Sequence, residues 1–144
     1  MNLPIKIEGI VFTKENGDFK FLIIKRVPND GGFWQPLTES LEEGETVEEC
    51  LRRGLLEELG INNVICITDR FWSFPWENKK GEPNIDLVYG VEIPKDTEIK
   101  INPEEHSEYK WCTFDEVMVL LGKENNKAAF KKFKNIFITI LNKI

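Results

Sequence analysis

Residues 39–61 read ESLEEGETVEECLRRGLLEELGI, and they contain the strongest helix signals of the chain. Thr46 followed three residues later by Glu49 forms a capping box, which typically begins a helix. Gly60 suits the left-handed conformation that often ends one. We therefore predict a helix over residues 47–59. Its apolar side chains recur at helical spacing and should form a buried stripe of Val47, Cys50, Leu51, Leu55 and Leu59.

Two neighbouring carboxylates lie near the end of this predicted helix. Glu57 and Glu58 follow Gly54 by three and four residues, so the three positions share one face. Adjacent carboxylates repel each other unless a cation lies between them, and Mg²⁺ suits such a place because it prefers oxygen ligands. Taken alone, the pair is more typical of a solvated acidic face. Arg53, one turn before Glu57, is able to pair with a carboxylate of the preceding loop such as Glu45.

The spacing resembles the Nudix box, the signature of the Nudix (MutT-type) hydrolases, which reads G-x5-E-x7-R-E-U-x-E-E-x-G-U with U aliphatic. Seven of its nine defined positions match, and the predicted helix is the context that the motif needs. The matching residues are Glu45, Arg53, Leu55, Glu57, Glu58, Gly60 and Ile61. Glu39 stands in place of the leading glycine, and Gly54 in place of the glutamate after the arginine.

These two departures have different expected consequences. A glycine at the position of Glu39 usually relieves backbone strain, so its loss should alter the loop that enters the helix. In the family, the glutamate at the position of Gly54 is commonly a magnesium ligand and sometimes the base. A glycine inside a helix also costs about 1 kcal/mol relative to alanine. The sequence shows no structural reason for tolerating Gly54.

The resemblance extends beyond the box to the dihydroneopterin triphosphate diphosphatase branch of the family. Residues 33–45, FWQPLTESLEEGE, are similar to an FWQ…T-S-x-EEGE run of that branch. Residues 105–111, EHSEYKW, are similar to its E-H-x-x-Y-K-W segment. The similarity covers most of the chain as far as Phe114. It implies an α/β class fold, an α/β/α sandwich around a mixed β-sheet.

The resemblance also implies a metal site and its catalytic groups. Glu57, Glu58 and Glu105 would bind Mg²⁺, with Mn²⁺ as an alternative. Glu58 or Glu105 would be the general base, and Arg53 would support the site. From the residues alone, Glu105 is equally well an acidic surface residue, and His106 is more typical of a structural histidine than of a catalyst.

Substrate-binding positions also follow from the resemblance. They are Arg26, Trp34 and Glu45, with Glu45 oriented by Arg53. Three further aromatic residues alternate along one predicted strand, where aromatics belong to the core more often than to a ligand site. They are Trp72, Phe74 and Trp76.

The implied activity is Mg²⁺-dependent hydrolysis of a diphosphate linkage in a nucleoside triphosphate, a pterin triphosphate or a dinucleoside polyphosphate. Water attacks phosphorus while the cation neutralises the phosphate oxygens, and a carboxylate removes the proton of the water. Because Gly54 removes one carboxylate, the alternative is a catalytically impaired Nudix domain that binds nucleotides or acts as a regulatory module. A third alternative is an interaction domain without a metal.

Outside the helix, runs of β-branched and aromatic residues predict strands. Asn16-Gly17 is a strong hairpin signal between residues 6–14 and 19–26. Residues 33–37 should form a short strand or extended segment, and residues 38–45 a loop. Further strands are expected over residues 64–67, 70–76, 85–92 and 109–114.

Two more helices are expected near the C-terminal end. The first is short and covers residues 115–121. The second covers residues 126–142 and should pack on the sheet through one apolar face. This face consists of Phe130, Phe133, Ile136, Phe137, Ile140 and Leu141.

Length and composition bound the class of protein. The 144 residues, with a net charge of −6, suit a single domain over residues 1–144. The acidic surface disfavours nucleic acid polymers, whereas a divalent cation can bridge carboxylates to a small phosphorylated molecule. We see no membrane segment and no secretory signal, and we expect a cytoplasmic protein. The oligomeric state is open, a homodimer included. An odd number of scattered cysteines predicts buried, reduced thiols, namely Cys50, Cys66 and Cys112.

Overall fold

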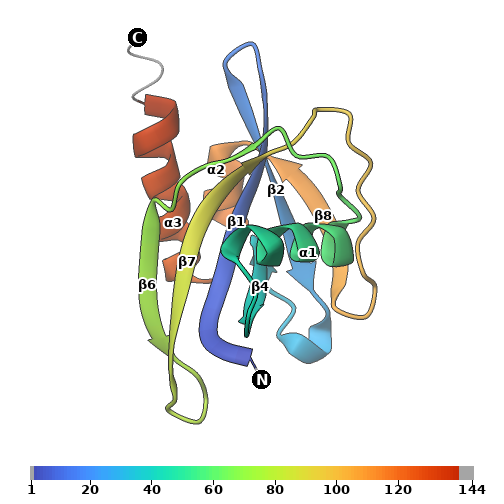
Figure 1. Ribbon diagram of the computed structural model, residues 1–144. Coiled ribbons are helices and arrows are strands. Elements are labelled where there is room, and N and C mark those ends of the chain that lie inside the picture. The colour runs from blue at the N-terminus through green and yellow to red at the C-terminus, as the bar shows by residue number, and fades with distance from the viewer. Residues whose placement is uncertain (1, 140–144) are drawn as a thin grey trace.

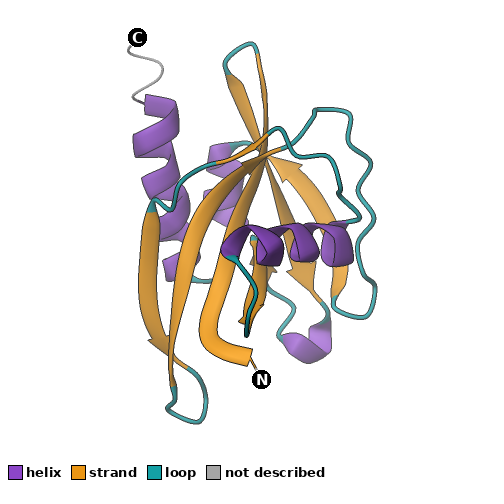
Figure 2. Ribbon diagram, viewed as in Figure 1, coloured by secondary structure: helices purple, strands orange, loops and turns teal. Residues whose placement is uncertain are grey.

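A mixed β-sheet lies between two helical layers in the computed structural model, which describes residues 2–139 (Figures 1 and 2). Helix α1 (Val47–Leu59) covers one face of the sheet, and α2 (Phe114–Leu120) and α3 (Glu124–Phe133) cover the other. The predicted α/β/α sandwich is therefore confirmed. The eight strands within the described residues are β1 (Asn2–Glu15), β2 (Asp18–Arg26), β3 (Trp34–Gln35), β4 (Leu37–Glu42), β5 (Cys66–Ile67), β6 (Trp72–Glu77), β7 (Pro83–Glu92) and β8 (His106–Cys112).

Strand β1 organises the sheet because it has three partners. Its C-terminal part pairs antiparallel with β2, its N-terminal part pairs antiparallel with β4, and β7 runs parallel to its middle. Asn16 and Gly17 turn the chain between β1 and β2 with positive φ angles of 53° and 86°. The predicted hairpin is confirmed, and its turn uses the conformations that asparagine and glycine adopt most readily.

Two hydrophobic cores fill the space on either side of the sheet. The core under α1 contains the predicted stripe, with Cys50, Leu51, Leu55 and Leu59 buried and Val47 packed against them. Thr46 and Glu49 form the capping box, and Gly60 ends the helix with φ 67°, so the helix over residues 47–59 is confirmed. The core under α2 and α3 is built around a group of aromatic rings that includes Phe12, Phe21, Phe130 and Phe133.

The expected loop over residues 38–45 is wrong in its first half. Leu37–Glu42 is strand β4, in which Glu39 pairs with Ile7 and Thr38 with Glu8 of β1. The polar residues of β4 have a weak strand preference, and pairing with a strand far away in the sequence overrides it. The expected strand over residues 33–37 is correspondingly split between β3 and β4.

Other boundaries differ by a few residues. The strand expected over residues 64–67 is reduced to Cys66–Ile67, β8 begins three residues earlier than expected, and α2 begins and ends one residue earlier. The last helix begins at Glu124 and continues from Phe133 into a π-helical segment, η2 (Lys134–Thr139). Ile140 and Leu141, expected on its apolar face, lie outside the described residues.

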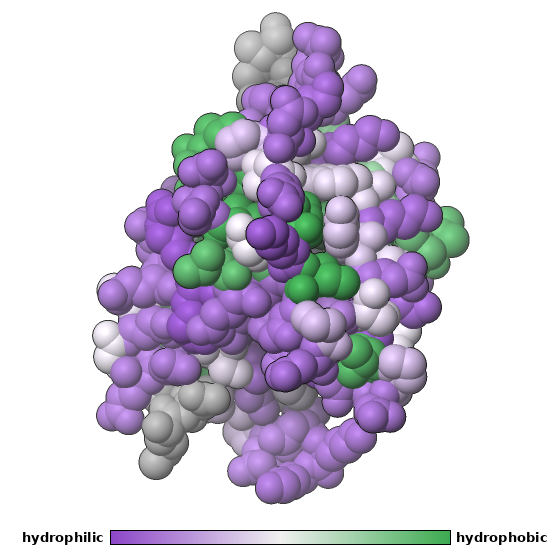
Figure 3. Space-filling model, turned by 90° about the vertical axis from the view of Figure 1, so that its right-hand side faces the viewer, coloured by the Kyte–Doolittle hydropathy of each residue, from purple (hydrophilic) through white to green (hydrophobic). Residues whose placement is uncertain are grey.

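The surface is mainly hydrophilic on the face drawn in Figure 3, with hydrophobic side chains in separate patches. No helix among residues 2–139 is both long and apolar enough to cross a membrane. All three cysteines are free thiols; Cys50 and Cys112 are buried, but Cys66 is exposed, so the expectation of burial is wrong for Cys66. Cys66 lies on the two-residue strand β5, at the end of the strand order, and it is Ile67 of this strand that packs against the core under α1.

Candidate metal and substrate site

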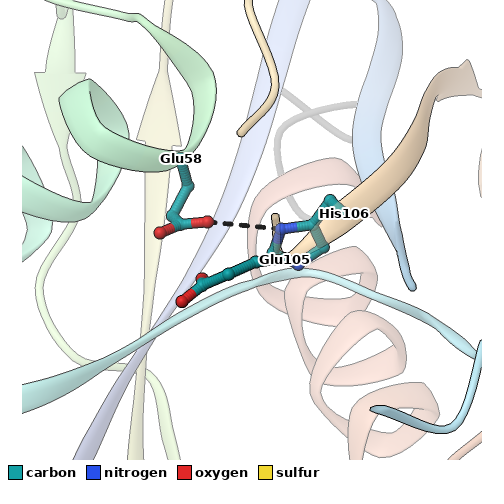
Figure 4. Close-up of side chains that lie close together, drawn as sticks. All are labelled: Glu58, Glu105 and His106. Carbon is teal, nitrogen blue, oxygen red and sulfur yellow. Dashed lines mark ion pairs between the residues drawn. The ribbon is translucent and has the colours of Figure 1, made fainter. Parts of the chain in front are cut away.

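Four carboxylates from three elements meet beside the second half of α1. Glu57 and Glu58 lie on α1, Glu39 lies on β4, and Glu105 directly precedes β8. Possible ligand atoms of Glu39, Glu57 and Glu58 lie within 4.8 Å of one another, and so do those of Glu58, Glu105 and His106. Glu58 belongs to both groups and therefore stands at the centre of the cluster, as Figure 4 shows for the second group.

Glu57 and Glu58 point in different directions although they are neighbours. The Glu58 residue is only 6% exposed, whereas the side chain of Glu57 is 54% exposed. Successive helical residues differ by about 100° in direction, so one of the pair faces the sheet while the other faces solvent. The helix thus supplies one buried carboxylate and one at the rim.

His106 holds the buried carboxylate of Glu58 from the opposite side. Its Nδ1 lies 3.2 Å from Oε2 of Glu58, as the dashed line in Figure 4 marks. Its Nε2 lies 3.2 Å from the amide nitrogen of Gln35. Because that amide nitrogen can only donate, Nε2 accepts, and the neutral ring carries its proton on Nδ1, facing Glu58.

Burial favours the neutral form of both groups. It lowers the pKa of His106, and the nearby charge of Arg26 lowers it further. Burial, followed by the neighbouring Glu105, raises the pKa of Glu58 to about 8. The 3.2 Å contact between His106 and Glu58 is therefore not an ion pair between two charged groups at neutral pH.

The cluster fits a hard divalent cation. Counting contacts with the described residues only, Oε2 of Glu58 is buried without a well-directed hydrogen bond. An orphaned carboxylate oxygen among other carboxylates is costly unless something positive binds there. Mg²⁺ and Mn²⁺ prefer oxygen ligands, and the carboxylates of Glu39, Glu57 and Glu105 offer such ligands here.

Arg53 ties the cluster to the loop before α1. Its Nε donates to Oε2 of Glu45 at 2.7 Å and one terminal nitrogen donates to Oε1 at 3.0 Å. The same terminal nitrogen donates to the carbonyl oxygen of Ser40 at 2.8 Å, and the other donates to Glu39 at 3.1 Å. Arg53 also lies 3.6 Å from Glu57. Hydrogen bonding from Arg53 lowers the pKa of Glu45 to about 2, and the same bond raises the pKa of Arg53.

The sequence interpretation of Glu39 is corrected by the structure. Glu39 lies in β4 rather than in a loop, and it is not among the described residues with positive φ. A glycine is therefore not needed there to relieve the backbone. The Glu39 side chain lies over α1 at Gly54, where a Cβ atom on residue 54 would stand 3.0 Å from Oε2 of Glu39. This contact is the structural reason for Gly54 that the sequence did not show.

A cavity of about 460 Å³ opens beside the carboxylates. Its walls combine aromatic, basic and acidic side chains, including Phe33, Phe74, Trp76, Lys6, Arg26, Lys123, Glu39, Glu105 and Asp86. Nε of Arg26 is buried and, with respect to the described residues, has no hydrogen-bond acceptor. Nε1 of Trp76 donates to Asp86 at 2.7 Å. A volume of this size is typical of small-molecule sites.

Of the three residues expected to bind substrate, the structure brings one to the cavity. Arg26 lines it. Trp34 packs against the core under α2 and α3, and Glu45 is occupied by Arg53, so neither is among the lining residues. Phe33, the neighbour of Trp34, takes part in its place, because successive residues of an extended segment point to opposite sides.

Several site residues were not predicted from the sequence. Glu39 was treated only as a missing glycine, and Asp86 was not singled out. His106 was expected to be structural, and its position against Glu58 was not foreseen, although its direct attachment to Glu105 was a usable signal. Of the three aromatics on β6, Phe74 and Trp76 line the cavity, whereas Trp72 packs against the core under α2 and α3.

Comparison with known proteins agrees with this architecture. The chain is 28% identical over 131 residues to an octanoyltransferase of Myxococcus xanthus, covering 90% of this chain but only 36% of that relative. It is 25% identical over 142 residues to a dihydroneopterin triphosphate diphosphatase of Escherichia coli K12, covering 90% of this chain and 91% of the relative. A Caenorhabditis elegans Ap4A hydrolase structure superposes with a TM-score of 0.77 at 18% identity, covering 97% of this chain and 98% of that one.

The family model described as the NUDIX domain matches residues 7–133, which include both helical layers, the carboxylate cluster and all residues that line the cavity except Lys6. The chain spans about a third of the length of the octanoyltransferase but nearly all of the diphosphatase. The expected Nudix resemblance is therefore confirmed, and the chain belongs to the NUDIX domain family.

Proposed function

We propose that this protein is a metal-dependent hydrolase that cleaves a diphosphate linkage in a small phosphorylated molecule. The observation that carries the proposal is the buried oxygen of Glu58, which accepts no hydrogen bond from the described residues, in a carboxylate cluster of which Glu39 and Glu105 line the cavity. Glu57, Glu58 and Glu105 would hold Mg²⁺, or Mn²⁺ in its place. When bound, the cation would neutralise phosphate oxygens and polarise the attacking water.

Side chains of this protein would supply the general base and hold the metal ligands in position. Glu105 lines the cavity whereas Glu58 is buried against His106, which favours Glu105 as the general base. His106 would keep Glu58 in position, because its Nδ1 lies 3.2 Å from Oε2 of Glu58. Arg53 would hold α1 against the segment that precedes it, through hydrogen bonds to the Glu45 carboxylate and to the carbonyl oxygen of Ser40.

The cavity supports a substrate that combines a flat ring with phosphates. Phe74 and Trp76 offer aromatic surface, and Arg26, with its buried unpaired Nε as judged within residues 2–139, offers a donor for a phosphate oxygen. Candidate substrates are nucleoside triphosphates, pterin triphosphates and dinucleoside polyphosphates. The E. coli relative is named for a pterin triphosphate, which puts this class first in a substrate panel.

The alternative is a NUDIX domain that binds nucleotides without turning them over. The feature that favoured it was Gly54 in place of a carboxylate. The position of Glu39, whose carboxylate lies beside Gly54 and near Glu57 and Glu58, supports the enzyme over this alternative. A cytoplasmic location, the absence of nucleic acid binding, a homodimer and a single domain over residues 1–144 stay predictions.

The test is a Mg²⁺ titration that follows phosphate or pyrophosphate release from the three substrate classes. We expect release that requires Mg²⁺ or Mn²⁺ and falls by at least about a hundredfold in Glu58→Gln and Glu105→Gln. Glu104→Gln is the matched control, because Glu104 is exposed and lies beside Glu105 but outside the cluster. Ligand binding without any product would favour the binding module instead.

A further inference from the structure

Glu39 and Gly54 are the two positions at which the chain departs from the Nudix box, and they touch each other in the fold. Glu39 lies on β4 and Gly54 on α1, two elements that pack together. Each carries the residue type that the motif has at the other position. The two departures therefore form one exchange across the β4–α1 contact.

The contact explains why a glutamate at residue 39 occurs together with a glycine at residue 54. A Cβ atom added to Gly54 would lie 3.0 Å from Oε2 and 3.3 Å from both Cβ and Cγ of Glu39. The carboxylate and Cγ of Glu39 can move by rotation about χ1, but its Cβ is fixed by the strand backbone and also lies 3.3 Å from the added atom. A side chain at residue 54 and one at residue 39 thus compete for the same space.

The Glu39 carboxylate is held in that space by a defined partner. Arg53 donates to Oε1 of Glu39 at 3.1 Å, and the Glu39 side chain is only 16% exposed. Its Oε2 is the oxygen that faces residue 54. Ligand atoms of Glu39, Glu57 and Glu58 lie within 4.8 Å of one another, so Glu39 stands inside the cluster rather than beside it.

We infer that Glu39 supplies from β4 the metal-binding carboxylate that the motif carries on α1 at position 54, in a site shared with Glu57 and Glu58. This inference rests on the proposed metal-dependent function. A second observation points to a cation there: Oε2 of Glu58, a residue of the same group, is buried and accepts no hydrogen bond from the described residues, although Nδ1 of His106 lies 3.2 Å away.

The exchange makes a specific prediction for single and double substitutions. Gly54→Glu alone places two side chains in one space and should harm the site, although the motif carries glutamate there. Glu39→Gln alone keeps the shape but removes the charged ligand. The double substitution Glu39→Gly with Gly54→Glu returns the carboxylate to the helix and should keep metal binding.

The experiment is a titration of the full chain with Mn²⁺, followed by electron paramagnetic resonance of the free ion. We expect Glu39→Gln to weaken Mn²⁺ binding by about tenfold or more, and the double variant to bind within about threefold of the wild type. Glu43→Gln is the matched control, because Glu43 is an exposed carboxylate of the same segment outside the cluster, and it should bind as the wild type does. Circular dichroism and thermal unfolding check that each variant is folded.

Two results overturn the inference. One is wild-type Mn²⁺ affinity in Glu39→Gln; the other is a folded double variant that binds Mn²⁺ as poorly as Glu39→Gln. If Glu58→Gln loses binding while Glu39→Gln keeps it, only the role of Glu39 fails and the proposed function stands. If the wild type binds no Mn²⁺ at millimolar concentration, the proposed function fails as well.

Discussion

Arg53 donates two parallel hydrogen bonds to the Glu45 carboxylate, from Nε at 2.7 Å and from a terminal nitrogen at 3.0 Å. The planar guanidinium of arginine matches a carboxylate in this way, and the single ammonium of lysine cannot. The pair closes the loop between β4 and α1, so the position of the carboxylate cluster depends on it.

We therefore expect Arg53→Lys to lower the free energy of unfolding by about 2 kcal/mol, the worth of hydrogen bonds to charged groups. Urea denaturation at pH 7 measures this change. Arg52→Lys is the matched control, because Arg52 pairs with Glu48 at 3.1 Å between side chains that are 50% and 67% exposed, and such pairs contribute little. Equal effects of the two substitutions would show that the paired hydrogen bonds between Arg53 and Glu45 are not important for stability.

The contact between Glu39 and Gly54 predicts a coupling in stability that is independent of any metal. Alanine at an open helix position stabilises by about 1 kcal/mol relative to glycine. We expect Gly54→Ala to realise that gain in a Glu39→Gly background but to lose most of it in the wild-type background, where the new Cβ meets Glu39. A double-mutant cycle by urea denaturation without metal should give a coupling of about 1 kcal/mol. Additive effects would mean that Glu39 moves away at no cost.

The parts of the structure that depend on neighbouring residues were predicted well, and those that depend on distant contacts were not. The capping box at Thr46, the end at Gly60 and the buried stripe are local patterns, so α1 could be placed to the residue. Strand β4 was missed because its partner β1 lies about thirty residues away. For the same reason Glu39 and Gly54 looked like two independent losses, since their compensation exists only where β4 meets α1.

A buried acid near the cavity predicts how stability changes with pH. Glu8 is fully buried, and neither of its carboxylate oxygens has a hydrogen-bond partner within the described chain. Burial, followed by the charge of Asp86, raises the pKa of Glu8 well above 4.5. Because the folded state holds this proton more tightly than the unfolded state, the contribution of Glu8 to stability is fully present below pH 4.5 and is lost as pH rises toward the folded pKa.

Glu8→Gln removes this titration while keeping the shape of the side chain. We expect the stability of the wild type relative to Glu8→Gln to be constant below about pH 4 and to fall by about 1.4 kcal/mol per pH unit above the unfolded pKa. Urea denaturation of both proteins between pH 4 and pH 7 measures the difference, and effects of groups common to both cancel. A difference that does not change with pH would mean that Glu8 titrates normally in the folded protein.

Two tryptophans of β6 allow substrate binding and core packing to be tested apart. Trp76 lines the cavity, whereas Trp72, on the same face of the strand, packs against the core under α2 and α3 with the Lys132 ammonium 5.4 Å from its ring centre. Phe74, between them, does both. An aromatic contact is worth roughly 1 kcal/mol beyond its buried area. For the best substrate in the panel, we expect Trp76→Leu to raise KM by about three- to tenfold with kcat little changed, because the ring would bind ground state and transition state alike.

Trp72→Leu is the matched control, since it removes the same ring from the same strand outside the cavity. It should leave KM unchanged and lower the midpoint of thermal unfolding instead, because it removes core packing. Steady-state kinetics and thermal unfolding of both variants give the comparison. If Trp76→Leu leaves KM at the wild-type value, the ring of the substrate does not lie against Trp76, and its place must be sought at Phe74 or Phe33, the other aromatic residues that line the cavity.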